Sequence, residues 1–480
     1  MTDIYRREFL TSVAALAAAA VSLPSASGAA SAAVPDVGEA AGALPERGEF
    51  VIRGATVLTM DDALGNIDNG AVHVRNGEIV AVGETVDAPA ATIIDGTGSI
   101  VMPGLVDTHW HMWNTILRSF SGNSGKEGYF ATSGRFGKLM MPQDILASSM
   151  LSAAEAINSG ITTIYNWGHN ARSRDHAEAD ILSMTASGLR GRYYFGWGQG
   201  HSDEEPIDFS AIEGLQKDWG RLDGGGMVTL GFGWRGMYRA TGLPEAVYRA
   251  DYEAARGLKL PMSVHVGSSQ KAKGQVGQLA DNKFLGPDMQ IVHAISSTPE
   301  EIARVKDAGS AFAATPGSEM RIGFGLPKIG EYIAAGVPTG IGIDSVSLSG
   351  TANLFEIIRW ARNVEKAKKL SEFDMPAIDA LRLGTIDGAR SVGIDDRVGS
   401  LTPGKRADLL MITTDALNMG VFTDAENMAV ECTTPANVDT VVIDGRILKR
   451  GGKLVHLNRD AIVGNARVAL AGIRERAAWR

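Results

Sequence analysis

Two histidines separated by one residue, His109 and His111, follow an apolar run that begins at Val101. Such a run is typical of a buried β-strand, in which residues i and i+2 project from the same face. We therefore expect both imidazoles to leave the strand end in one direction. Imidazole nitrogens that converge in this way form half of a tetrahedral metal site.

Three more polar residues, His265, His293 and Asp344, each follow a short apolar segment further along the chain. Taken singly, each has an ordinary explanation, because a histidine can be a hydrogen-bonded core residue and an aspartate can cap a helix. Together with His109 and His111 they would bring four imidazoles and a carboxylate to one edge of a sheet. That coincidence is hard to obtain by chance and favours a functional site.

The segments that must position these residues alternate between two types from Val101 to about Val346. Short apolar segments predict strands, and Ala-rich amphipathic segments between them, several of them ending in Gly, predict helices. The predicted strands are 100–106, 161–167, 191–197, 227–234, 260–266, 289–294, 310–315 and 338–343. Eight such units predict an α/β fold, a (β/α)8 TIM barrel whose functional residues lie at the C-terminal ends of the strands.

Strand patterns also flank the barrel on both sides. Asn76-Gly77 and Asp444-Gly445 each separate two apolar runs, which is the strongest short-range signal for a hairpin. We expect both chain ends to build one small β-sandwich domain. Its N-terminal part is 48–100, the barrel is 101–395, and its C-terminal part with a terminal helix is 396–480.

Residues 1–32 have the pattern of an export signal. Arg6-Arg7 precedes an apolar run over 11–23 and a small-residue stretch over 25–33. The paired arginines resemble a twin-arginine-type signal, so we expect export to the periplasm or the medium. The apolar run is too short to span a bilayer comfortably, and no cysteine lies near it, so no membrane anchor is expected. The alternative is an apolar leader that stays attached.

The composition limits the classes of binding partner and the residue types that can bind a metal ion. The net charge of -9 over 480 residues argues against nucleic acid, whose binding proteins have basic surfaces. The one cysteine, Cys432, can form neither an intrachain disulfide nor a thiolate cluster. Any metal must therefore be held by histidine and carboxylate.

Four segments resemble the metal motifs of the amidohydrolase superfamily, most closely its cytosine deaminase and triazine (chloro)hydrolase-like branch: 103–111, 263–265, 291–293 and 340–344. The resemblance covers nearly the whole mature chain, including the segment 401–409. No lysine ends the strand 229–235, so the carboxylated lysine of the two-metal members is missing. The resemblance thus implies one metal, with the ligands His109, His111, His265 and Asp344. It also implies that His293 hydrogen-bonds the attacking water or the substrate.

Three neutral imidazoles and a carboxylate suit a divalent ion, and we expect Zn²⁺ ahead of Fe²⁺. The ion would lower the pKa of a bound water towards about 7. Asp344, beside that water, can accept its proton and pass it to the leaving group. A Glu or Asp elsewhere is expected to fix the imidazole tautomers.

One position departs from the branch. Many of its deaminases carry Glu three residues after the histidine that corresponds to His265, and this chain has Ser268 there. Serine cannot act as a carboxylic acid at neutral pH, so a hydrolysis with a better leaving group, or with another acid, is favoured over a cytosine-type deamination. Glu319 is the candidate substitute; the alternative is a surface carboxylate paired with Arg321.

His169 and His201 follow the second and third predicted strands, and we expect both to contact the substrate, together with Ser268, Glu319 and Trp113. Trp113 is one of several tryptophans near strand ends that indicate a pocket with aromatic walls. Ordinary packing explains any one of them equally well.

The sequence therefore predicts an exported, metal-dependent hydrolase that acts on a non-peptide C–N bond of a cyclic or aromatic small molecule, as an amidohydrolase or deaminase. One alternative is hydrolysis of an ester, lactone or carbon–halogen bond at the same site. Another is a non-catalytic ligand-binding barrel. Relatives are often dimers or larger, so the resemblance also admits a homo-oligomer.

Overall fold

The computed structural model describes residues 36–120, 122, 124–237 and 242–479. The predicted export signal, 1–32, lies outside the described residues. Within them, no helix is both long enough and apolar enough to cross a membrane.

Eight parallel strands form one sheet in the described part of the chain, in the order in which they occur in the sequence. They are β6 (Leu105–Trp110), β7 (Ile161–Gly168), β8 (Arg190–Phe195), β9 (Val228–Trp234), β10 (Met262–Val266), β11 (Met289–His293), β12 (Ala311–Ala314) and β13 (Thr339–Ile341). A parallel bridge between Trp110 and Asp344 joins the two outer strands, so the sheet nearly closes on itself. The predicted (β/α)8 barrel is confirmed.

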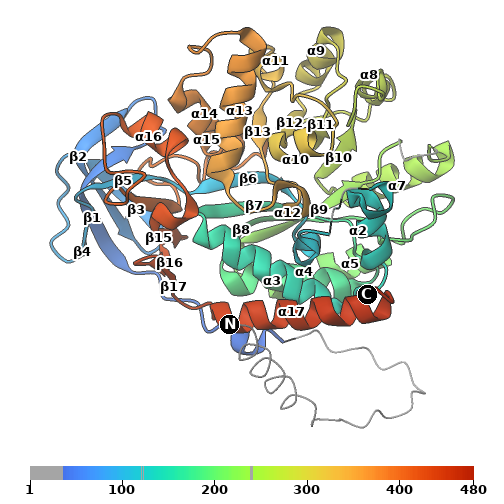
Figure 1. Ribbon diagram of the computed structural model, residues 1–480, viewed down its shortest axis with the longest axis horizontal. Coiled ribbons are helices and arrows are strands. Elements are labelled where there is room, and N and C mark those ends of the chain that lie inside the picture. Colours follow the sequence, from blue (N-terminus) through green and yellow to red (C-terminus); the bar gives the residue numbers. More distant parts are fainter. Residues whose placement is uncertain (1–35, 121, 123, 238–241, 480) are drawn as a thin grey trace, which may run out of the picture. The chain divides into compact units, whose positions relative to one another are not determined.

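Helices connect these strands and cover the outside of the barrel (Figure 1). The principal ones are α3 (Pro142–Asn158), α4 (Arg174–Ser187), α7 (Glu245–Gly257), α9 (Pro299–Asp307), α11 (Ile329–Ala334) and α13 (Leu354–Lys369). All residues of β6 and β7 are buried, as expected for parallel strands with helices on one face and a filled barrel interior on the other.

A second, mixed sheet combines both ends of the chain. Its strands are β1 (Glu49–Leu58), β2 (Asn66–Arg75), β3 (Glu78–Gly83), β4 (Thr92–Asp95), β5 (Ser99–Pro103), β14 (Leu409–Thr413), β15 (Val438–Ile443), β16 (Arg446–Arg450) and β17 (Lys453–Leu454). β5 and β14 pair antiparallel, which joins the blue N-terminal and red C-terminal strands in Figure 1. This sheet from both chain ends is consistent with the predicted β-sandwich.

The predicted first barrel strand, 100–106, is wrong in one respect, because this run contains two strands. β5 belongs to the small sheet, and β6 begins the barrel only at Leu105. Gly104 separates them: a Cβ at this position would lie 2.3 Å from Thr162 Cγ2, so only glycine fits here. Its N–H donates to the carbonyl of Asp408, 2.9 Å away.

A buried ion-pair network connects the two sheets. The Arg190 guanidinium, at the start of β8, donates to both oxygens of Asp408, at 2.7 and 3.0 Å. It also reaches Asp444, in the β15–β16 turn, at 3.3 Å. Removing one partner would leave a buried charge unpaired, which is strongly destabilising.

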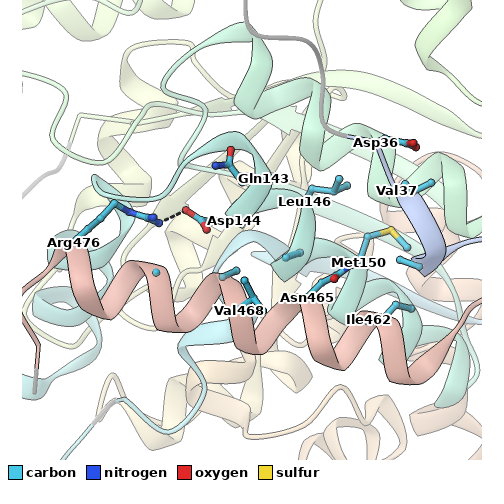
Figure 2. Close-up of a pocket in the computed structure, with 14 residues that line it drawn as sticks. Asp36, Val37, Gln143, Asp144, Leu146, Met150, Ile462, Asn465, Val468 and Arg476 are labelled. Carbon is cyan, nitrogen blue, oxygen red and sulfur yellow. Dashed lines mark hydrogen bonds and ion pairs between the residues drawn. The ribbon is translucent and has the colours of Figure 1, made fainter. Parts of the chain in front are cut away.

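The predicted terminal helix is α17 (Arg459–Arg476), which packs against α3. Figure 2 shows the hollow between them, with the ion pair of Arg476 and Asp144 at one end. Its volume is about 350 Å³, and its apolar lining includes Met150, Ile462 and Val468. None of the candidate site residues lines it.

Candidate active site and metal centre

Four side chains bring one ligand atom each to a common point at the C-terminal end of the barrel. His265 Nε2 lies 3.1 Å from His109 Nε2 and 3.3 Å from His111 Nε2. Asp344 Oδ1 lies 3.3 Å from His111 Nε2 and 3.7 Å from His109 Nε2. The structure thus places the four residues together, although they come from β6, β10 and the segment after β13.

The backbone at the closing seam between β6 and β13 sets these positions. The Asp344 N–H donates to the His109 carbonyl at 2.8 Å, and the His111 N–H donates to the Asp344 carbonyl at 2.6 Å. The buried Asp107 carboxylate accepts from the N–H groups of His109 and Ile343, at 3.0 and 2.9 Å. Sequence reasoning missed Asp107, although its place two residues before His109 on a buried strand was a usable signal.

The tautomer of His111 is fixed by its environment. Its Nδ1 lies 2.7 Å from the carbonyl oxygen of Trp167, so Nδ1 carries the proton and Nε2 keeps its lone pair. This partner is a backbone carbonyl, not the predicted Glu or Asp. Burial lowers the pKa of His111 to about 3. Burial, reinforced by neighbouring imidazoles, also holds the pKa of His109 and His265 well below the usual range, so all three rings are neutral.

The donor set fits a divalent metal ion. Neutral imidazoles can present lone pairs at Nε2, and three such nitrogens this close together form an arrangement that a cation between them stabilises. The ligand atoms of the three histidines all lie within 4.8 Å of one another. Burial raises the pKa of Asp344, although His293 and a hydrogen bond from Ser318 oppose the shift. Three nitrogens and one oxygen could therefore hold the ion.

His293, the last residue of β11, lies beside this cluster. Its ring centroid is 5.3 Å from that of His265 and 6.0 Å from that of His109. Its Nδ1 lies 3.2 Å from Glu319 Oε1 and 3.1 Å from Thr315 Oγ1. Burial alone would lower the pKa of His293, but the hydrogen bond to Glu319 and the nearby carboxylates raise it above the ordinary value.

Glu319 lies on the short helix α10 (Pro316–Arg321), and its exposed fraction is 0%. The alternative of a surface carboxylate paired with Arg321 is therefore wrong. The structure places Glu319 behind His293, which makes it a partner of that ring. Sequence reasoning missed Thr315, which nothing but its position after the seventh strand could have indicated.

Aromatic rings surround the four converging residues on one side. The ring centroid of His169, just after β7, is 4.0 Å from that of His111. The fully buried Trp113 donates its indole N–H to His169 Nδ1, at 3.1 Å. The rings of Trp167 and Trp197 both have centroids 5.6 Å from His169. His169 and Trp113 are thus packed against the cluster.

His201 and Ser268 are not hydrogen-bonded to the four ligands in the described part of the chain. His201 Nε2 lies 3.1 Å from the Glu205 carbonyl oxygen. Its side chain lines a hollow of about 350 Å³, together with Trp197 and Asp208. Ser268 is partly exposed in the loop after β10.

A (β/α)8 barrel with converging histidine and carboxylate side chains at the C-terminal ends of its strands is typical of metal-dependent barrel hydrolases. Residues 100–448 match the model of the amidohydrolase family, so the chain belongs to this family. The predicted superfamily and the prediction of a hydrolase are confirmed. The family and the deaminases among its relatives support hydrolysis of C–N bonds other than peptide bonds.

Several known proteins are similar to this chain over almost their whole length. A 5'-deoxyadenosine deaminase of Methanosarcina acetivorans is 24% identical over 440 residues, which cover 89% of this chain and 99% of the relative. A 5-methylthioadenosine/S-adenosylhomocysteine deaminase of Pelotomaculum thermopropionicum is 27% identical over 432 residues, covering 87% and 97%.

Solved structures share the fold. An adenosine deaminase from Xanthomonas campestris with bound zinc superposes with a TM-score of 0.78 at 22% identity, covering 90% of this chain and 100% of the other. An atrazine chlorohydrolase from Arthrobacter aurescens complexed with zinc gives a TM-score of 0.74 at 23% identity, covering 88% and 100%.

Proposed function

We propose that this protein hydrolyses a C–N bond on a nitrogen-containing aromatic ring and releases ammonia, as a deaminase. The observation that carries the proposal is the convergence of three imidazole nitrogens and the Asp344 carboxylate on one point. The deaminases among the relatives, which act on adenine-containing molecules, support an amino-purine as the substrate class.

Each residue has a distinct task in this proposal. A divalent ion, which we propose to be Zn²⁺, would lower the pKa of a water molecule towards about 7. Asp344, whose pKa is raised by burial, is suited to accept a proton from water and release it again. The rings of His169 and Trp197 provide flat surfaces against which a heteroaromatic ring can pack.

The test is ammonia release by the zinc-loaded, full-length protein. The panel contains 5'-deoxyadenosine, 5-methylthioadenosine, S-adenosylhomocysteine and adenosine, and metal content is measured on the same sample. We expect ammonia from at least one compound, and none from a His109→Ala/His111→Ala variant. A metal-loaded protein that releases no ammonia from any of them would contradict the proposal.

Ser268 favours a second candidate, hydrolysis of an ester, lactone or carbon–halogen bond at the same site. A leaving group such as chloride or an alcohol needs less help from an acid than an amine does. The discriminating measurement is mass spectrometry of products from a chlorinated triazine, a lactone and an aryl ester. Turnover of these compounds without ammonia release from the purine panel would favour this candidate.

We also propose that residues 1–32 direct export through the twin-arginine route, on the basis of Arg6-Arg7 and the apolar run that follows. Cell fractionation tests this with an Arg6→Lys/Arg7→Lys variant. We expect the variant to stay in the cytoplasm. Unchanged export would contradict the proposal.

A further inference from the structure

Glu319 and His293 form a buried, hydrogen-bonded pair beside the candidate metal ligands. Glu319 Oε1 meets both the His293 Nδ1, at 3.2 Å, and the Thr315 N–H, at 3.0 Å. Its other oxygen, Oε2, is buried and has no hydrogen-bond partner among the described residues. A buried carboxylate oxygen without a partner destabilises the fold by about 1–3 kcal/mol, so it calls for an explanation.

The backbone at His293 is also strained. Its φ is 72° and that of Ala294 is 45°, a left-handed conformation that residues other than glycine adopt at a cost. This conformation turns the end of β11 so that the ring lies between Glu319 and the metal ligands. Strained backbone together with an unsatisfied acid is typical of a functional site.

We propose that Glu319 is a positioning residue that acts through His293. Accepting a hydrogen bond from Nδ1 fixes the tautomer in which Nδ1 carries a proton and Nε2 is the reactive nitrogen. The negative charge also stabilises the ring whenever Nε2 takes up a second proton. His293 can then transfer the proton. Many deaminases of this branch have Glu where this chain has Ser268, and serine cannot act as an acid at neutral pH.

This inference rests on the proposed deamination, for which the protons balance. Asp344 takes one proton from the attacking water while the C–O bond forms. It passes that proton to His293 Nε2, and the charged ring is held by Glu319. Nε2 then gives the proton to the leaving nitrogen as the C–N bond breaks, so ammonia departs and both side chains return to their starting states.

A purely structural role is the competing explanation, because Glu319 Oε1 also caps the N-terminus of α10 through Thr315. Gln in its place keeps Oε1, and therefore keeps both hydrogen bonds while removing only the charge. Glu319→Gln thus separates the two roles, and Glu319→Ala removes both.

We expect Glu319→Gln to lower kcat about 10-fold and Glu319→Ala about 10²-fold, within the range for general acid–base groups. KM, zinc content and melting temperature of Glu319→Gln should stay close to wild type. Asp288→Asn, which changes an exposed carboxylate paired with Arg256, is the control and should leave kcat unchanged. Wild-type kcat in a folded Glu319→Ala protein would overturn the proposal.

A double-mutant cycle tests whether Glu319 acts through the ring. His293→Asn tolerates the left-handed backbone, and in this background Glu319→Gln should cause no further loss of kcat. Losses that multiply would overturn the proposal, since Glu319 would then act independently of His293.

A readout without substrate separates this inference from the proposed function. Nitrogen-15 NMR of histidine-labelled protein reports which ring nitrogen carries a proton. We expect a proton on His293 Nδ1 in the wild type and its loss or exchange in Glu319→Ala. A bare Nδ1 in the wild type would overturn the inference even if ammonia were released, and a protonated Nδ1 would support it even if the substrate panel failed.

Discussion

The main-chain N–H of His111 donates to the carbonyl oxygen of Asp344 across 2.6 Å, and the carboxylate of the same aspartate lies 3.3 Å from His111 Nε2. One pair of residues therefore both closes the barrel and assembles the candidate metal centre. Any change that opens the seam between β6 and β13 should also move the ligands apart.

Asp344→Asn tests the ligand set. Asn tolerates the φ of 62° at this position better than Ala, so the backbone seam should persist. We expect lower zinc content by elemental analysis, and turnover reduced by about 10³-fold, because both the anionic ligand and the proton acceptor are lost. Asp288→Asn, which changes an exposed carboxylate paired with Arg256, is the control and should leave both values unchanged. Full turnover in Asp344→Asn would exclude this carboxylate from the chemistry.

Gly342→Ala tests the coupling of closure to metal binding. The new Cβ would lie 2.5 Å from the His109 carbonyl oxygen and 2.7 Å from its nitrogen, and this backbone cannot give way. We expect a loss of at least about 2 kcal/mol in the free energy of unfolding, together with lower zinc content. Gly257→Ala meets no atom within 4 Å on helix α7 and should be neutral or slightly stabilising. Denaturant titration and zinc analysis of both variants check this, and normal zinc binding in Gly342→Ala would refute the coupling.

Asp180→Asn tests how the ionisation of a buried carboxyl group affects stability. Burial raises the pKa of Asp180 to about 6, although hydrogen bonds from Ser149 and Asn166 oppose the shift. The folded state therefore favours the protonated form, and this contribution to stability is present below pH 3.8 and lost as the pH rises through about 6. At pH 7 the Asn variant should be more stable by roughly 1–3 kcal/mol.

The pH profile provides the check on that prediction. Wild-type stability from denaturant titration should contain a component that falls between pH 4 and pH 6, and this component should be absent in Asp180→Asn. A variant with an unchanged profile, or with lower stability at pH 7, would show that burial does not raise the pKa of Asp180.

Trp113→Phe tests the support of His169. The substitution removes the indole N–H that donates to His169 Nδ1 while keeping an aromatic ring. We expect turnover to fall by about 10-fold at unchanged zinc content. This is the lower end of the losses expected when the hydrogen-bond partner of a site residue is removed. Trp234→Phe is the matched control, since its buried indole donates to the Tyr248 carbonyl at 3.2 Å. Equal kcat values for the two variants would mean that the Trp113 contact serves stability alone.

The barrel and its functional end could be predicted because each signal is local. A short apolar segment that ends in His265 or His293 predicts a buried strand and a side chain at its C-terminal end, and parallel strands place such ends together. The break at Gly104 had a local signal, because the Pro103-Gly104 dipeptide inside the apolar run is typical of a break between elements. The reason that only glycine fits there could not be predicted, because Thr162 is brought beside it only by the tertiary fold.

The hydrogen-bond partners of the imidazoles could not be predicted from the sequence either. The pattern predicted that carboxylates would fix the tautomers, yet His111 is held by the carbonyl of Trp167, which every residue type offers. Glu319 was found as a candidate, but its place behind His293 depends on how α10 leaves β12. Sequence spacing predicts which strand end a residue follows, and only packing decides which ring it touches.

The seam between His111 and Asp344 also has a consequence for biosynthesis. A chain still emerging from the ribosome has His109 and His111 long before the residue that supplies the carboxylate exists. Until the last strand docks, the nascent protein cannot assemble the full set of candidate ligands, so metal capture should mark the completion of folding. Loading would then be a checkpoint that a truncated or misassembled product fails.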